Sequence, residues 1–218
     1  MAWVHAPAHS WNHSLCTMAS LNRRDLRKLL LGPDTPANIL EAAAGALHKL
    51  AEITDNQVAI ATAPGVIPLL VQLLGPGSAA GNSAQQGSLQ QCAAGILGSL
   101  AGNADNAVTI AAAGAVPPLV QLLGAGSAAR VQHNAAAALE LARNADNAVT
   151  IADAGAIPLL VQLLGACSND ATKSVASGAL QRLGQSSAYI RTAIAAAGAS
   201  ANLIREMEGL GIGGPAGG

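Results

Sequence analysis

The chain has 218 residues and a formal net charge of −1 at pH 7; 51% of its residues are hydrophobic, only 1% are aromatic and 11% are charged. Such a composition offers no basic surface that could neutralise phosphates, so we expect no nucleic-acid partner. Its three cysteines lie far apart and lack CxxC spacing, which argues against a disulfide framework and against a zinc site. We therefore expect a protein of the cytoplasm or nucleus, where thiols stay reduced, with no metal or other cofactor.

Residues 1–24 differ from the rest of the chain. They hold both tryptophans, three of the five histidines and no acidic residue. His5, His9 and His13 would share one face of a helix, as metal ligands do, but no amphipathic pattern supports a helix here. We predict a disordered leader, and an organellar transit peptide and a late start at Met18 are the open alternatives.

Beyond the leader the chain repeats itself. Residues 103–124 read NADNAVTIAAAGAVPPLVQLLG, and residues 144–165 read NADNAVTIADAGAIPLLVQLLG, at a distance of 41 residues (144 − 103). A third copy, at residues 55–75, lies 49 residues before the first of these (121 − 72) and has one extra residue before Gly65. Self-similarity at such a period is typical of a solenoid, in which each unit buries its apolar face against the next.

Incomplete units flank the three full copies. LRKLLLG at residues 26–32 matches the end of a second helix, and a degraded half-unit with Ile194 and Gly198 follows the last copy. We therefore predict a repeat array over residues 25–208 and a flexible Gly-rich tail over residues 209–218.

Each copy reads as a cycle of three helices, most clearly in the last full one. Asp146 or Asn147 is suited to the N-cap of a short first helix. Val149 and Ile151 are predicted to point inward. Gly155 ends the helix in a conformation that favours a residue without Cβ.

The second and third helices of this copy follow directly. Pro158 lies in the first turn of the second helix, where its missing N–H costs nothing. An apolar stripe runs along this helix, and Gly165 stops it. Asp170 then caps the third helix, which we predict to end at Gly184.

One copy is longer than the others. Leu74 and Leu100 are 26 residues apart (100 − 74), whereas Leu123 and Leu141 are 18 apart (141 − 123). The surplus falls in GPGSAAGNSAQQGS, residues 75–88, whose small and polar residues cannot form a core. We predict a mobile excursion between the second and third helices.

The repeated pattern is N-x-x-x-I-x-x-x-G-[AV]-[IV]-P-x-L-V-x-L-L, followed by a helix of the form A-A-x-A-L-x-x-L-A. It resembles the armadillo repeat over about residues 25–208. The resemblance implies an all-α fold, a right-handed α-solenoid (armadillo superhelix) of three full three-helix repeats flanked by partial units. The units are most similar to the armadillo arrays of U-box ubiquitin ligases and of vacuolar armadillo scaffolds.

The resemblance also implies a concave groove lined by the third helices. It places three groove-facing positions, four residues apart, on each third helix. The outer two are the predicted partner-binding residues: Glu41 and Lys49, Gln91 and Ser99, Gln132 and Glu140, and Ser174 and Arg182. Importin alpha needs tryptophan at the middle position, and this chain has only Gly or Ala there (Gly45, Gly95, Ala136, Gly178). A basic groove for acidic ligands, as in beta-catenin, is not indicated either, because glutamates offset Lys49 and Arg182.

No pattern of catalytic residues recurs in the units. G-x-G-x-x-A at residues 124–129 has the spacing of a dinucleotide-binding loop. The repeat contradicts that reading, because the equivalent positions Gly75-Pro-Gly77 and Gly165-Ala-Cys167 lie at the same turn between two helices. Pro117 and Pro118 also exclude a central strand before it. We therefore expect no enzyme activity.

These observations predict a non-enzymatic protein–protein interaction scaffold or adaptor that binds a partner segment in its groove. The chain is expected to be monomeric, with a protein or peptide partner, no nucleic acid and no membrane insertion. The alternative is the substrate-recognition array of a U-box type E3 ubiquitin ligase, or of a relative of one, without its catalytic domain.

Overall fold

The computed structural model describes residues 37–76, 83–166, 169–200 and 203–204. Three of the predictions lie outside the described residues: the leader at residues 1–24, the partial unit at residues 26–32 and the tail at residues 209–218.

All regular elements in the described ranges are helices. In chain order they are α3 (Ala37–Ala51), α4 (Thr54–Thr62), α5 (Val66–Leu74), α6 (Ser83–Leu100), α7 (Ala104–Ala112), α8 (Val116–Leu122), α9 (Ala129–Ala138), the 3-10 helix η1 (Leu139–Arg143), α10 (Ala145–Asp153), α11 (Ala156–Ala166), α12 (Asp170–Ser186) and α13 (Ala188–Ala196). The predicted cycle appears as α4–α5–α6, as α7–α8–α9 with η1, and as α10–α11–α12. The all-α solenoid predicted from the repeats is confirmed.

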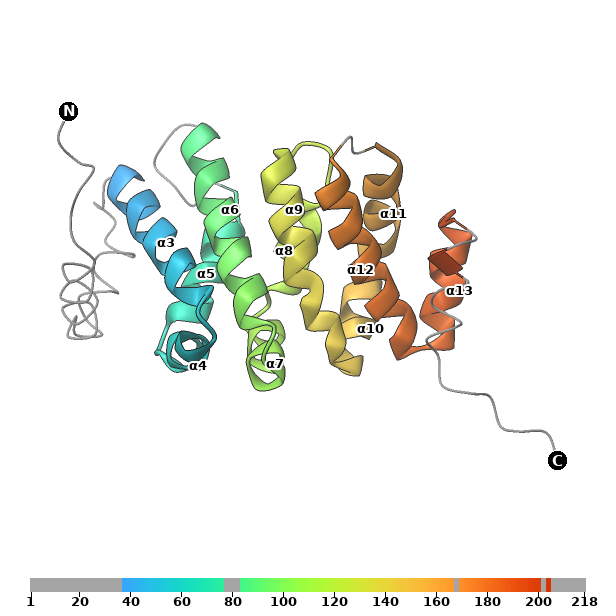
Figure 1. Ribbon diagram of the computed structural model, residues 1–218, viewed down its shortest axis with the longest axis horizontal. Helices are drawn as coiled ribbons and strands as arrows, with labels where there is room; N and C mark the ends of the chain where they lie inside the picture. Colours follow the sequence, from blue (N-terminus) through green and yellow to red (C-terminus); the bar gives the residue numbers. More distant parts are fainter. Residues whose placement is uncertain (1–36, 77–82, 167–168, 201–202, 205–218) are drawn as a thin grey trace.

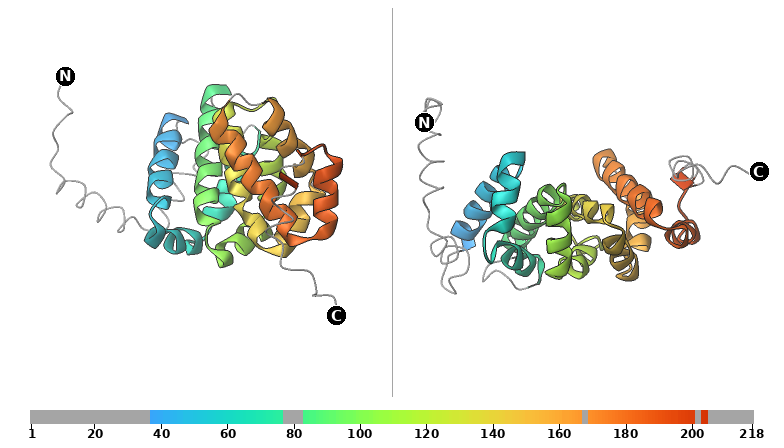
Figure 2. Two further views of the ribbon diagram at one scale, coloured as in Figure 1. Left: turned by 45° about the vertical axis from the view of Figure 1, so that its right-hand side comes forward. Right: turned by 90° about the horizontal axis from the view of Figure 1, so that it is seen from below.

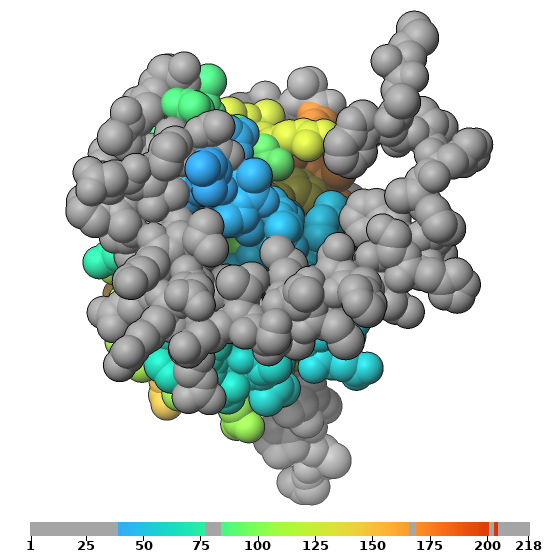
Figure 3. Space-filling view, turned by 90° about the vertical axis from the view of Figure 1, so that its left-hand side faces the viewer, coloured from blue at the N-terminus to red at the C-terminus, as the bar shows by residue number. Residues whose placement is uncertain are grey.

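Successive units stack side by side. The third helix α6 packs against α3 on one side and α9 on the other, and α12 packs against both α9 and η1. Figure 1 shows α3, α6, α9 and α12 in one row at the front, with the second helices behind them. The stack bends along its length in the two views of Figure 2, and Figure 3 looks onto the end where α3 lies. The third helices thus form one continuous layer.

Asparagines cap the first helices of two units. The Asn144 side-chain oxygen accepts from the backbone N–H of Asp146 at 3.0 Å and of Asn147 at 3.1 Å, and Asn103 makes the same two bonds one unit earlier. The predicted cap at Asp146 or Asn147 is wrong, because the helix already begins at Ala145 and both residues lie in its first turn. The extended backbone of Asn144 places its side chain over these N–H groups.

Removing this cap is expected to destabilise the array. Asn144→Ala should lower the free energy of unfolding by about 1 kcal/mol, because two backbone N–H groups lose their acceptor. Urea denaturation followed by circular dichroism measures the change. Asn144→Ser is the control, since it keeps an acceptor and should retain most of the stability. An equal loss in both variants would contradict the capping role.

A second asparagine connects neighbouring units. Asn147 is buried, and its Nδ2 donates to the backbone oxygen of Ala107 at 3.2 Å, which ties α10 to α7. Asn106 is the equivalent residue one unit earlier and is equally buried, yet its Nδ2 has no hydrogen-bond partner among the described residues. Two equivalent junctions therefore differ in one lateral hydrogen bond.

The first and second helices of each unit join at a left-handed glycine. The φ angles are +84° at Gly65, +81° at Gly114, +82° at Gly155 and +88° at Gly198. A Cβ at any of these glycines would meet no atom within 4 Å, so the backbone angle and not space requires glycine. The prediction for Gly155 is confirmed, and Pro158 lies in the first turn of α11 as expected.

Within the described residues, no single helix is both long enough and apolar enough to cross a membrane. Two consecutive pairs, α4 with α5 and α10 with α11, reach the required length and composition only when taken together, and they are bent by 93° and 78°.

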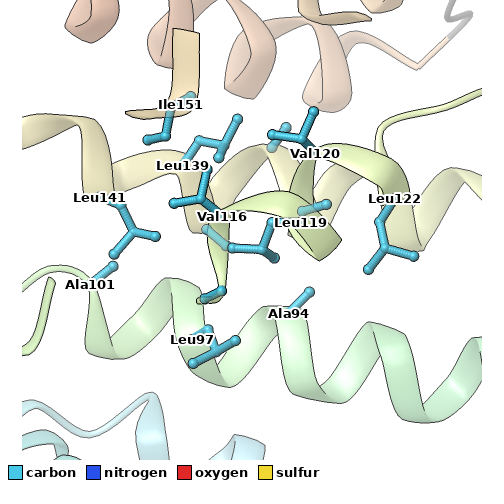
Figure 4. Close-up of a cluster of buried hydrophobic side chains, with 14 of the residues drawn as sticks. Ala94, Leu97, Ala101, Val116, Leu119, Val120, Leu122, Leu139, Leu141 and Ile151 are labelled. Atoms are coloured by element: carbon cyan, nitrogen blue, oxygen red, sulfur yellow. The ribbon is translucent and has the colours of Figure 1, made fainter. Parts of the chain in front are cut away.

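The second helices are surrounded by the core. Leu119 of α8 is fully buried, and Figure 4 shows it among side chains from α6, η1 and α10. Ile151 is also fully buried, as predicted, but Val149 is 48% exposed. Residues two apart on an α-helix point about 200° apart, so both could not face inward. Ala148, three residues before Ile151, takes the inward position.

Two predicted helix ends are wrong by one or two residues. Helix α11 continues past Gly165 to Ala166, and α12 continues past Gly184 to Ser186. Among the described residues neither glycine adopts a positive φ, so neither interrupts its helix. The N-cap of α12 is Asn169 and not Asp170, which lies inside the first turn. Glycine and aspartate thus mark the neighbourhood of a helix end better than its exact residue.

The predicted excursion at residues 75–88 is partly wrong, because α6 begins at Ser83. Two glutamines hold this early part of α6 to the end of α5. Gln86 Nε2 donates to the backbone oxygen of Gly75 at 2.7 Å, and Gln90 Nε2 donates to that of Leu74 at 3.0 Å. Gln86 of the surplus segment and Gln90 just beyond it therefore satisfy C-terminal carbonyls of the preceding helix.

Candidate binding face of the third helices

The exposed side of α3, α6, α9, η1 and α12 is here called the third-helix face. Seven of the eight predicted partner-binding residues have side chains accessible to solvent. Lys49 and Ser174 are exposed, and the other five are half-buried: Glu41, Gln91, Ser99, Glu140 and Arg182. The eighth, Gln132, is buried at 9% exposure.

Gln132 points away from the third-helix face. Its Nε2 donates to the backbone oxygens of Leu123 at 3.2 Å and Gly124 at 2.9 Å, at the end of the preceding helix α8. Ala136, predicted to lie in the groove, is also buried, at 1% exposure. Both placements are therefore wrong for α9.

The η1 segment explains this difference. A 3-10 helix advances about 120° per residue and an α-helix about 100°, so five 3-10 residues rotate α9 relative to a continuous α-helix. Asn134 of the same helix is half-buried and faces α6. Its Nδ2 donates to the backbone oxygen of Gln91 at 2.8 Å and so joins α9 to α6. No turn residue or proline in the sequence announces the change to 3-10 geometry.

Gly95 lies where side chains from both neighbouring helices meet over α6. A Cβ on Gly95 would stand 2.5 Å from Cε1 and Nε2 of His48 and 3.0 Å from Nδ2 of Asn134. The space above this glycine is therefore occupied by an imidazole from α3 and an amide from α9. Gly95, one of the middle positions of the predicted groove, is thus covered by polar side chains from the two neighbouring helices.

The position of His48 over Gly95 is expected to make stability depend on pH. Burial is the main cause that lowers the pKa of His48 below its ordinary value of 6.5, Glu52 opposes this shift and Lys49 adds to it. The unfolded chain then binds the proton more tightly than the folded one. Above about pH 6.5 the His48 imidazole is neutral in both states and does not lower the free energy of unfolding. This free energy falls as the pH drops from the pKa of His48 in the unfolded chain to its lower pKa in the folded chain.

Urea denaturation at pH 7.5 and pH 5 tests this expectation with the parent chain and His48→Gln. The parent should lose more stability than the variant between the two pH values, because only the parent carries the imidazole. The titratable groups other than His48 and its neighbour Glu52 are common to both proteins, so their contribution cancels in the comparison. An identical pH dependence of the two proteins would contradict the role of His48.

Arg182, Glu140 and Arg143 form an ion cluster between η1 and α12. Nη2 of Arg182 lies 2.7 Å from Oε1 of Glu140, and Nε of Arg143 lies 3.4 Å from Oε2 of the same carboxylate. The side chains of Glu140 and Arg182 are 28% and 31% exposed, and that of Arg143 is 58% exposed. Two predicted site residues, Glu140 and Arg182, are thus brought together, and Arg143 joins them without having been predicted.

A pocket of about 560 Å³ lies beside this cluster. Gly178 forms part of its wall. The polar residues that line it come from the end of η1 and from the C-terminal half of α12, and they are Arg143, Gln181, Arg182, Gln185 and Ser186. No carboxylate lines the pocket. A Cβ on Gly178 would stand 3.2 Å from Nη1 of Arg182, so the guanidinium lies against this glycine.

The described part of the chain contains no group of three or more His, Cys, Asp or Glu residues that could hold a metal ion. Cys92 is half-buried against the core, and burial raises the pKa of its thiol, with a smaller contribution from Glu41.

Comparison with known proteins agrees with this architecture. A family model described as Armadillo/beta-catenin-like repeat matches residues 103–140 and 144–184, while no curated protein sequence matches the chain. An engineered protein solved by the Northeast Structural Genomics Consortium is 27% identical with a TM-score of 0.69, and the match covers 85% of this chain and 75% of that one.

Two designed proteins show the same fold at lower identity. A computationally designed armadillo repeat protein for modular peptide recognition is 21% identical with a TM-score of 0.71, covering 90% of this chain and 82% of that one. A designed armadillo repeat protein in complex with peptide (KR)4 is 20% identical with a TM-score of 0.69, covering 92% and 90%. Residues 103–140 and 144–184 are therefore two successive armadillo repeats within a stacked three-helix architecture.

Proposed function

We propose that this armadillo chain is a non-enzymatic adaptor that binds an extended segment of a partner protein along the third-helix face. The observation that carries the proposal is the continuous row of α3, α6, α9 and α12. Helices of this row present solvent-accessible polar side chains, among them Lys49, Gln91 and Arg182, that an extended peptide would meet in turn. One similar designed protein holds the peptide (KR)4, which supports a peptide as the ligand class.

The charge of the face limits the class of partner. Lys49 pairs with Glu52 at 2.7 Å, and Arg182 pairs with Glu140 at the same distance. These two pairs are charge-balanced, so we infer no preference for a polyanion or a polycation along the whole face. Amide side chains such as Gln91 and Asn134 suit hydrogen bonds to a peptide backbone, so we infer a partner segment of mixed sequence held by backbone and local side-chain contacts.

Affinity capture tests this function with a matched pair of variants. The full chain is used as bait, and captured proteins are identified by mass spectrometry. Lys49→Gln combined with Arg182→Gln removes two positive charges from the third-helix face. Thr109→Glu combined with Thr150→Glu changes the net charge equally at exposed positions on the first helices α7 and α10. A partner lost only with the first pair supports the adaptor.

Two other outcomes would contradict the proposal. Retention of every partner by the face variant would place binding elsewhere on the molecule. Capture of ubiquitin-conjugating enzymes with transfer of ubiquitin would instead favour the ligase-related alternative, which otherwise remains a prediction from sequence resemblance.

A further inference from the structure

The pocket beside α12 contains two arginines from neighbouring units and no carboxylate. Arg143 comes from the end of η1, and Arg182 comes from α12, 39 residues later in the chain (182 − 143). In a count of formal charges from the sequence, the negative charge of Glu140 cancels the positive charge of Arg182. In the structure Glu140 contacts both guanidinium groups but is not part of the pocket lining. The pocket lining itself therefore contains two guanidinium groups, and the carboxylate in contact with them lies outside that lining.

The Glu140 carboxylate uses only one nitrogen of each guanidinium group. It contacts the Nη2 atom of Arg182 and the Nε atom of Arg143. A guanidinium group has five N–H donors in a planar fork, so each arginine keeps further donors for a second acceptor. Two cations around one carboxylate also leave a net positive charge of one.

Two neighbouring features favour an anion at this place. The guanidinium group of Arg182 lies against Gly178, where a side chain would push it away. The last carbonyls of α12 would repel an anion, but Arg191 Nη1 donates to the backbone oxygen of Gly184 at 2.8 Å and offsets that negative end. Asp146 follows the pocket residue Ala145 closely in sequence and does not line the pocket.

We propose that this pocket binds the carboxylate of an Asp or Glu side chain in the partner segment, held jointly by Arg143 and Arg182. The inference rests on the proposed function, because it names the chemistry of one residue in the bound segment. Charge complementarity selects the occupant, because the two guanidinium groups that line the pocket match a carboxylate and would repel lysine or arginine. Glu140 acts as a positioning residue that keeps both arginines at the pocket wall.

A small carboxylate tests the pocket directly. N-acetyl-glutamate N-methylamide is titrated into the full chain while the arginine Nε–Hε signals are followed by NMR. Signals of Arg143 and Arg182 should shift and saturate, and N-acetyl-glutamine N-methylamide, the neutral isostere, should leave them unchanged. Arg143→Gln and Arg182→Gln should each weaken binding about threefold, and the double variant about tenfold.

Two controls separate pocket binding from general electrostatics and from misfolding. Thr109→Glu makes the same change in net charge as one arginine substitution, at an exposed position that does not line the pocket, and should leave the affinity unchanged. Circular dichroism melting confirms that each variant folds. Shifts that spread equally over all arginines without saturating, or an unchanged affinity in the double variant, would overturn the inference.

Selection from a displayed random-peptide library separates this inference from the adaptor function. Peptides enriched on the parent chain should contain Asp or Glu at one fixed position, and this preference should vanish on the Arg143→Gln, Arg182→Gln double variant. Enriched peptides without that preference would overturn the inference and leave the adaptor function standing. No enriched peptide at all, with the small carboxylate still bound, would overturn the adaptor function and with it the assignment of the pocket to a partner segment.

Discussion

Leu119→Ala is expected to lower the free energy of unfolding by about 2–5 kcal/mol. Leu119 has no exposed surface, and it lies between side chains of its own unit and of the units on either side (Figure 4). Truncation removes buried methyl groups and leaves a cavity that rigid helices on several sides cannot close. Urea denaturation of parent and variant, followed by circular dichroism, measures the loss.

Val108→Ala is the matched control for this substitution. Val108 is an aliphatic residue of the adjacent helix α7, but it is 49% exposed. Its truncation should change the free energy of unfolding by less than about 0.5 kcal/mol. Similar effects of the two substitutions would contradict the core described here.

Gly98→Val is expected to destabilise the array by about 1–3 kcal/mol through overpacking. A Cβ on Gly98 would stand 3.3 Å from the backbone nitrogen of Ala138, 3.4 Å from its Cα and 3.6 Å from the backbone carbon of Ala137. These atoms belong to the backbone of α9 and cannot rotate away as a side chain can. The two helices would have to separate, which disturbs the row of third helices.

Gly87→Ala in the same helix should have the opposite effect. A Cβ on Gly87 meets no atom within 4 Å, so alanine adds only its better helix propensity. We expect a gain of about 0.5–1 kcal/mol in the free energy of unfolding. Thermal and urea denaturation of both variants should show a lower free energy of unfolding for Gly98→Val and a higher one for Gly87→Ala. A stabilising Gly98→Val would show that α6 and α9 do not approach each other closely.

The fold was predictable because its signals are local and repeated. Gly155 needs its left-handed backbone whatever surrounds it, and Pro158 fits only a first turn, so these residues identify the junction between helices in every copy. Errors arose where one position offered several residues of the same type. Asn144, Asp146 and Asn147 all cap helices well, and only the backbone angles decide which of them does so.

The candidate site was less predictable because it depends on contacts between units. Glu140 and Arg182 were predicted as separate groove residues, and their ion pair requires the stacking of η1 on α12. Gln132 was misplaced because the change from α9 to η1 alters the rotation of one third helix, and repeat alignment assumes that all third helices are alike. Arg143 has no counterpart in the other copies, so periodicity could not identify it.

The unequal asparagine junctions have a consequence for how the chain comes apart. In a linear array, cohesion is shared between nearest neighbours, and opening starts where the coupling is poorest. The amide of Asn147 joins its unit to the one before it, whereas that of Asn106 is buried without compensation. Local unfolding should therefore begin in the N-terminal units. In a hydrogen-exchange experiment, the backbone amide hydrogens of α4 and α5 should exchange with solvent before those of α10 and α11.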